Sequence, residues 1–87
     1  MELDDMMWEL RTFIRERFNV PDNDPDFNND VHLFDYGYVD SFGAVELTSF
    51  VKKEYSVEIT GSDLIAFPLN TIREIASFAV KRLNREI

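Results

Sequence analysis

The sequence predicts an all-α fold with three long helices, one short helix and a long loop after the first helix. Apolar residues recur every three or four positions in three separate stretches, which is typical of helices that bury one face. Residues 19–40 instead contain two prolines, four asparagines and six aspartates, which stop helices and favour turns. The extended stretch 57–60 is too short and isolated to predict more than a connector. We expect residues 1–87 to form a single domain.

The first helix is predicted from about Asp5 to Phe18. Acidic residues Asp4 and Asp5 suit its first turn, and basic residues Arg15 and Arg17 suit its last turn. We expect the cluster Met6-Met7-Trp8 to lie in the core. The apolar stripe of this helix consists of Leu3, Met7, Leu10, Ile14 and Phe18, with Met6 and Phe13 beside it.

The second helix is predicted from Ser41 to about Tyr55. Leu47, Val51 and Tyr55 are spaced by four residues and should face the core, with Phe50 beside them. Asp40 is a good N-cap, because its carboxylate accepts N–H groups of the first turn. Ser41 then lies on the helix rim, where the helix dipole stabilises an attached anion by about 0.3–1 kcal/mol.

Two further helices are expected after the connector. Gly61, Ser62 and Asp63 offer caps for a short helix through Leu64-Ile65-Ala66, and Pro68 ends it. Thr71 and Glu74 have the spacing of a capping box, which predicts the start of the last helix. The apolar stripe of this helix continues to about Asn84 and consists of Ile72, Ile75, Ala76, Ala79 and Leu83.

Charge is distributed unevenly along the chain. Residues 1–40 hold 11 acids and 3 bases, whereas residues 41–87 hold 6 of each, so the net charge of −8 arises before Ser41. Such an acidic surface repels nucleic acid and anionic membranes, which argues against both as partners. The chain has no cysteine, which excludes disulfides and cysteine zinc sites. No stretch is long and apolar enough to span a membrane, so we expect no membrane insertion and a cytoplasmic protein.

The residues around Ser41 suggest a family. The pattern Leu33-Phe34-x-x-Gly37-x-x-Asp40-Ser41-Phe42, followed by Val45-Glu46-Leu47, resembles the modification site of acyl and peptidyl carrier proteins. The resemblance implies a four-helix carrier bundle in which Ser41 bears a 4′-phosphopantetheine arm through a phosphodiester. It also implies that Asp40 caps the helix next to the arm and approaches the metal of the modifying enzyme. The implied partner-docking residues are Phe42, Val45, Glu46 and Ser49.

The same resemblance implies a function. The chain would be a stand-alone, monomeric, non-catalytic carrier that holds acyl or aminoacyl cargo as a thioester. Its partners would be a phosphopantetheinyl transferase, an adenylating acyl or aminoacyl ligase, and downstream acyl-accepting or condensing enzymes. Asp40 to Leu47 looks more like D-alanyl carriers than fatty-acid carriers, and Lys52-Lys53 departs from the acidic helix of the latter. Phe50 and Phe67 are candidates to fill the space that a long acyl chain needs.

Three other interpretations remain open. Asp24, Asp26, Asn28 and Asp35 have oxygen side chains near the spacing of a calcium loop, although Pro25 interrupts it and Asp replaces the usual final Glu. His32 could activate Ser41 together with Asp35 or Asp40, but no G-x-S-x-G elbow is present. The third interpretation is an unmodified acidic domain that docks other proteins. We predict neither a metal site nor a catalytic site in this chain.

Overall fold

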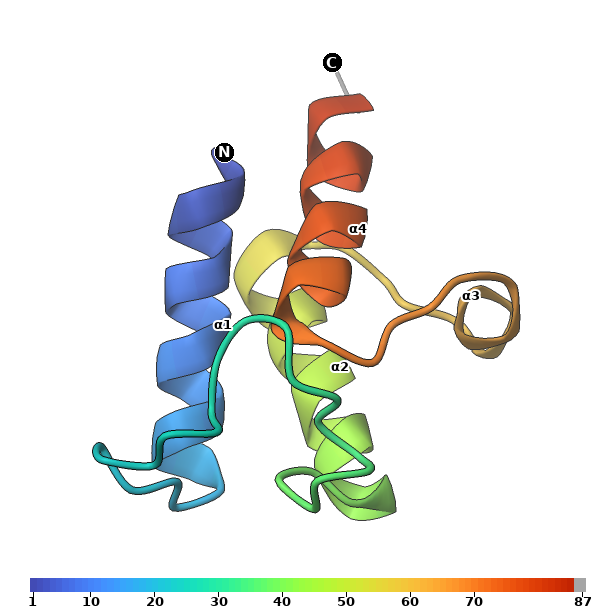
Figure 1. The fold of residues 1–87 in the computed structure, drawn as a ribbon. Coiled ribbons are helices and arrows are strands. Elements are labelled where there is room, and N and C mark those ends of the chain that lie inside the picture. Colours follow the sequence, from blue (N-terminus) through green and yellow to red (C-terminus); the bar gives the residue numbers. More distant parts are fainter. Residues whose placement is uncertain (86–87) are drawn as a thin grey trace.

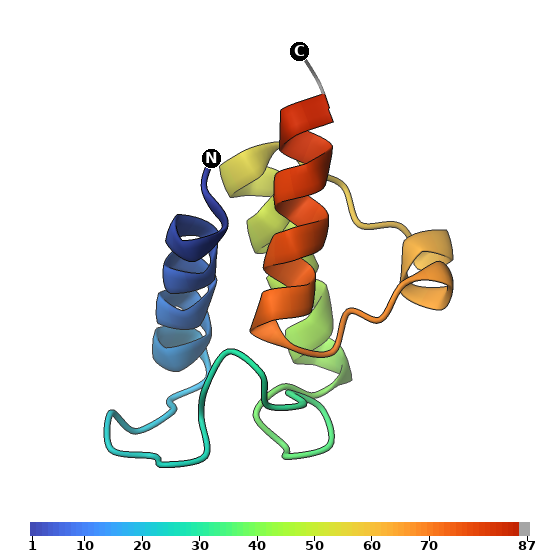
Figure 2. The ribbon, with the colours of Figure 1, turned by 45° about the horizontal axis from the view of Figure 1, so that its top comes forward.

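The computed structural model describes residues 1–85, which form four helices and no strand. The helices are α1 (Leu3–Arg17), α2 (Ser41–Tyr55), α3 (Gly61–Ala66) and α4 (Ile72–Arg85). Figures 1 and 2 show α1, α2 and α4 running alongside one another, while α3 stands to one side. The loop between α1 and α2 crosses the end of the bundle opposite Met1. This arrangement confirms the predicted carrier-type bundle of three long helices and one short helix.

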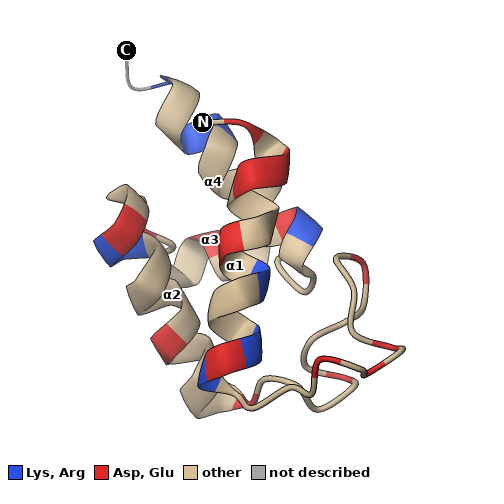
Figure 3. Ribbon diagram, turned by 90° about the vertical axis from the view of Figure 1, so that its left-hand side faces the viewer, with Lys and Arg blue, Asp and Glu red and all other residues tan. Residues whose placement is uncertain are grey.

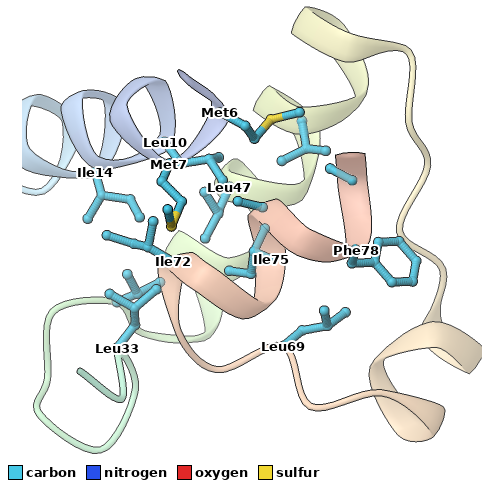
Figure 4. Close-up of a cluster of buried hydrophobic side chains, with 14 of the residues drawn as sticks. Met6, Met7, Leu10, Ile14, Leu33, Leu47, Leu69, Ile72, Ile75 and Phe78 are labelled. Atoms are coloured by element: carbon cyan, nitrogen blue, oxygen red, sulfur yellow. The ribbon is translucent and has the colours of Figure 1, made fainter. Parts of the chain in front are cut away.

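The core lies where α4 packs against α1 and α2 (Figure 4). Each long helix contributes the apolar stripe that its spacing predicts, because positions three or four apart share one helix face. The largest fully buried side chains are Met6, Leu10, Ile14, Leu33, Val51 and Ile72. One of these, Leu33, comes from the loop, so the loop is part of the core.

The structure corrects two details of α1. The helix begins at Leu3, two residues before the predicted start, and ends at Arg17. Met6 and Met7 are buried as expected, but the side of the helix that carries Trp8 faces solvent and Trp8 is 65% exposed. The prediction that Trp8 belongs to the core was therefore wrong. Successive residues turn about 100° around a helix axis, so three in a row cannot all face inward.

Backbone and side-chain contacts attach the long loop to the beginning of α4. Leu33 N–H donates to Asn70 O at 2.9 Å, and Arg73 N–H donates to Asn29 O at 3.0 Å. The Arg73 guanidinium also forms a two-pronged ion pair with Asp30, at 2.6 and 3.2 Å. This pair lowers the pKa of the Asp30 carboxyl from its ordinary value. The far end of the loop is therefore ordered.

The last two helices begin with capping boxes. In the second box, Glu74 N–H donates to Thr71 Oγ1 at 3.0 Å, and Glu74 Oε1 accepts from Thr71 N–H at 3.1 Å, as predicted. In the first box the cap is Thr60, one residue before the predicted Gly61-Ser62-Asp63 group. Thr60 Oγ1 accepts from Asp63 N–H at 3.1 Å, and Asp63 Oδ2 accepts from Thr60 N–H at 3.0 Å.

Acidic residues are spread along α1 and the loop after it (Figure 3), as the uneven charge of the sequence predicts. The last turn of α4 is basic, with Arg82 and Arg85. Within residues 1–85, no helix combines the length and the apolar character that crossing a bilayer requires.

Candidate functional site

Ser41 is the first residue of α2, and its side chain is exposed to solvent. Asp40 precedes it in extended conformation, and Asp40 Oδ1 accepts a hydrogen bond from Gly43 N–H at 2.8 Å. The predicted N-cap is therefore confirmed. Because Asp40 occupies the cap position, the Ser41 hydroxyl lies on the rim of the helix at its electropositive end.

The segment before Ser41 is held in place by a tight turn. Leu33 O accepts hydrogen bonds from Tyr38 N–H and Val39 N–H, at 2.9 and 3.1 Å. Gly37 has φ +78°, a conformation that residues with a side chain rarely adopt. Val39 is buried, and a Cβ at Gly43 would lie 3.0 Å from it. The turn and this close approach fix where α2 begins, and hence where the Ser41 hydroxyl lies.

An apolar cavity of about 360 Å³ opens beside Ser41. It lies between α2, the connector to α3, α3 itself and the start of α4. All of its lining residues except Ser41 and Thr48 are apolar: Phe34, Ala44, Val45, Leu47, Ile59, Leu64, Leu69 and Ile75. Neither Phe50 nor Phe67 lines it. The cavity can take an apolar group that reaches in from Ser41.

The surface around Ser41 is apolar. On α2, Phe42 is 82% exposed and Val45 is 64% exposed, while Ser49 is exposed one turn further along. Glu46 is half-buried and pairs with Arg17 of α1, so its charge is compensated within the chain. On α3, Ile65 is 90% exposed and Leu64 is 54% exposed. Leu64 and Ile65 were predicted to lie in a short helix, but not to form part of the surface near the serine.

His32 is engaged with Asp35. Its Nδ1 accepts a hydrogen bond from Asp35 N–H at 3.0 Å, and its Nε2 lies 3.7 Å from Asp35 Oδ2. Among the described residues, no hydrogen bond joins this histidine to Ser41. The structure therefore shows no arrangement in which the His32 imidazole activates the serine as a nucleophile.

The acidic residues of the loop bind its own backbone and side chains. Asp24 Oδ1 accepts from Asp26 N–H at 2.9 Å, and Asp24 Oδ2 accepts from the Tyr38 hydroxyl at 3.0 Å. Asn28 Oδ1 accepts from Asp30 N–H at 2.8 Å. Within residues 1–85, no three acidic or histidine side chains gather as a metal site would require. The calcium interpretation therefore gains no support from the described structure.

Comparison with known proteins identifies the family. Residues 8–79 match the family model described as phosphopantetheine attachment site, and this range covers most of the chain. The chain belongs to the phosphopantetheine-attachment family. A search of curated proteins and a search of solved structures gave no significant match. The match confirms the predicted acyl or peptidyl carrier family and its cofactor, a covalently attached 4′-phosphopantetheine. Carrier domains of this family are generally non-catalytic, and they interact with phosphopantetheinyl transferases and biosynthetic enzymes.

The residues around Ser41 fit the cofactor of the phosphopantetheine-attachment family. A phosphodiester needs an accessible hydroxyl, which Ser41 offers at the positive end of a helix. The first turn of α2 contains no acidic residue, and the carboxylate of the preceding cap residue Asp40 accepts the Gly43 N–H. The cavity next to Ser41 is apolar, so it can shelter part of an arm or its cargo from water.

Proposed function

We propose that Ser41 is the attachment residue and that the chain is an acyl or aminoacyl carrier. The observation that carries this proposal is the exposed Ser41 hydroxyl on the first residue of α2, beside an apolar cavity. Ser41 also lies inside the range that matches the family. Residues 1–87 would act as a single monomeric domain in the cytoplasm.

The chain itself contributes to attachment of the arm by positioning the Ser41 hydroxyl. Asp40 holds the first turn of α2 by accepting the Gly43 N–H, and this leaves the Ser41 hydroxyl accessible. Ser41 Oγ would attack the phosphorus of coenzyme A that carries the pantetheine arm. The new P–O bond of the phosphodiester would form as the pyrophosphate P–O bond breaks, adenosine 3′,5′-bisphosphate would leave, and the serine proton would pass to a base of the transferase. No neighbouring residue is required to activate the serine, since the transferase supplies that chemistry. Once attached, the arm supplies a thiol that carries cargo as a thioester.

Partner enzymes would dock on the surface around the serine. The proposed docking residues are Phe42, Val45, Glu46 and Ser49, and we add Leu64 and Ile65 of α3. Phe42 and Ile65 are the most exposed of these side chains, and we expect them to act as anchors, because an aromatic or aliphatic anchor that fills a pocket is typical of the centre of a binding interface. Glu46 would contribute less than an unpaired acid, since Arg17 already compensates its charge.

We propose an aminoacyl or short acyl group as cargo, loaded by an adenylating ligase. Downstream acyl-accepting or condensing enzymes would then remove it. The similarity of residues 40–47 to D-alanyl carriers supports this cargo class. The cavity beside Ser41 supports a cargo with an apolar part, because its lining offers only the hydroxyls of Ser41 and Thr48 for hydrogen bonding through side chains.

The attachment residue can be tested by intact-protein mass spectrometry. The chain is incubated with coenzyme A, Mg²⁺ and a phosphopantetheinyl transferase of broad specificity. We expect the mass to rise by one phosphopantetheine in the wild type and in Ser62→Ala, which alters an exposed serine of α3. We expect no gain in Ser41→Ala. A gain in Ser41→Ala, or none in a folded wild type with several transferases, would contradict the proposal.

The docking surface can be tested with the same enzyme. Phe42→Ala and Ile65→Ala should lower the rate of modification at limiting transferase while leaving the thermal midpoint nearly unchanged, because both side chains are exposed. Removing an apolar anchor costs about 1–2 kcal/mol of binding, or roughly five- to thirtyfold in rate. Unchanged rates in both variants would remove these residues from the docking surface without affecting the assignment of Ser41.

A further inference from the structure

A second groove lies between α1 and α2. Its volume is about 390 Å³, and it shares no lining residue with the cavity beside Ser41. The lining consists of three aromatic residues, three glutamates and Thr12. In Figure 3, α1 faces the viewer with α2 beside it, and acidic residues mark both helices. A ligand in this groove would leave the cavity beside Ser41 free.

The floor of the groove is aromatic. Phe13 of α1 stacks on Phe50 of α2, with ring centroids 4.1 Å apart and ring planes 17° from parallel. Both rings are only half-buried, so part of each faces the groove. Trp8 lines the same groove and is 65% exposed. Tryptophan with this exposure is unusual on a free surface but common at the centre of protein interfaces.

The charged residues that line the groove are all acidic. Glu9, Glu16 and Glu54 line it, and no lysine or arginine does. None of the ion pairs among the described residues uses these three carboxylates. Glu9 Oε1 accepts a hydrogen bond from the Tyr55 hydroxyl at 2.6 Å, which fixes this carboxylate at the junction of the two helices. The groove therefore combines aromatic faces with uncompensated negative charge.

We propose that this groove binds an arginine-bearing basic segment of a partner protein. A guanidinium group is planar and weakly hydrated, so it can stack on an aromatic ring and pair with a carboxylate at the same time. The groove offers both kinds of contact and no competing cation. The groove shares no residue with the docking surface around Ser41, and the inference does not depend on the attachment of an arm.

The experiment measures the fluorescence anisotropy of a labelled amphipathic peptide, with arginine at every fourth position, titrated with the full chain. A second peptide has glutamine in place of arginine. We expect saturable binding of the arginine peptide, quenching of Trp8, the chain's only tryptophan, and much weaker binding of the glutamine peptide. Trp8→Ala should weaken binding about tenfold, as expected for an aromatic anchor.

Two double variants that lose the same charge distinguish the effect of the groove carboxylates on binding from the effect of the overall negative charge. Glu16→Gln/Glu54→Gln removes two carboxylates from the groove, whereas Asp22→Asn/Asp26→Asn removes two exposed carboxylates from the loop. The first variant should bind the arginine peptide about threefold to tenfold more weakly than the second. Equal binding by both variants, equal binding of both peptides, or no binding by folded wild type would overturn the proposal. Self-association abolished by Trp8→Ala would also overturn it, since the occupant would then be a second copy.

Discussion

Asp63 in the first turn of α3 joins that helix to α4 through Arg82. Asp63 Oδ1 accepts a hydrogen bond from Arg82 Nη2 at 3.1 Å, while Asp63 Oδ2 accepts the Thr60 N–H at 3.0 Å. Arg82 also lies over the Phe78 ring, and Phe78 contacts Phe67 at the end of α3 edge-on. Since α3 contributes two residues to the proposed docking surface, the position of that surface depends on this contact.

We predict that Asp63→Asn makes stability less dependent on pH. Hydrogen bonds from Thr60 and the Arg82 guanidinium lower the pKa of the Asp63 carboxyl below its ordinary value of 3.8. A lowered pKa means that the stabilisation is present above pH 3.8 and is lost as the pH falls through the folded-state value. The thermal midpoints of wild type and Asp63→Asn should therefore differ near neutral pH and converge in acid. A difference that is constant with pH would contradict this.

We predict that Asp40→Ala destabilises the chain, whereas Asp40→Asn does not. Alanine cannot accept the Gly43 N–H, and loss of an N-cap costs about 0.5–2 kcal/mol, while asparagine caps as well as aspartate. Urea unfolding measures both. The rate of modification by the transferase distinguishes two roles of Asp40. If Asp40 acts only as the cap, Asp40→Asn is modified at the wild-type rate. If its carboxylate also approaches the metal of the transferase, Asp40→Asn is modified more slowly although its stability is unchanged.

We predict that Leu10→Ala costs about 2–5 kcal/mol of unfolding free energy. Leu10 is fully buried in the core between α1 and α4, so truncation leaves a cavity. Leu64→Ala is the matched control, because the Leu64 side chain is about half exposed and its loss should cost much less. Urea denaturation of both variants tests this, and equal losses would contradict the described packing.

We predict that Tyr38 ionises late. Burial, and next the hydrogen bond to Asp24, raises the pKa of the Tyr38 phenol to about 12 from an ordinary 10.0. The stabilisation is therefore present below pH 10.0 and is lost as the pH rises through about 12. In an absorbance titration of tyrosinate, Tyr38→Phe should remove a late phase and Asp24→Asn should shift it to lower pH. An unchanged late phase in Tyr38→Phe would contradict the assignment.

The local features of this fold could be predicted from the sequence. The limits of α2, its Asp40 cap and the Thr71–Glu74 capping box depend on neighbouring residues, and the structure confirms them. The prediction that Trp8 is buried was wrong, because neighbouring residues of a helix point in different directions and Trp8 lies on the solvent side. The Thr60 cap could have been found, since Thr60 and Asp63 have the same spacing as Thr71 and Glu74.

Long-range contacts of the candidate site could not be predicted in this way. The pairing of Glu46 with Arg17, and of Asp63 with Arg82, depends on how the helices are arranged in space. No local sequence pattern links the two members of either pair. For the same reason, the sequence does not show that Leu64 and Ile65 are exposed near the serine, since this depends on where α3 lies relative to α2.

Figures 1 and 2 show that Met1 and the last turn of α4 lie at the same end of the bundle, with the beginning of α2 at the opposite end. A chain anchored to a bead or sensor surface through either end would therefore point Ser41 toward the bulk solution. Immobilised binding measurements and fusions to a reporter protein are thus compatible with access to the serine from either attachment point.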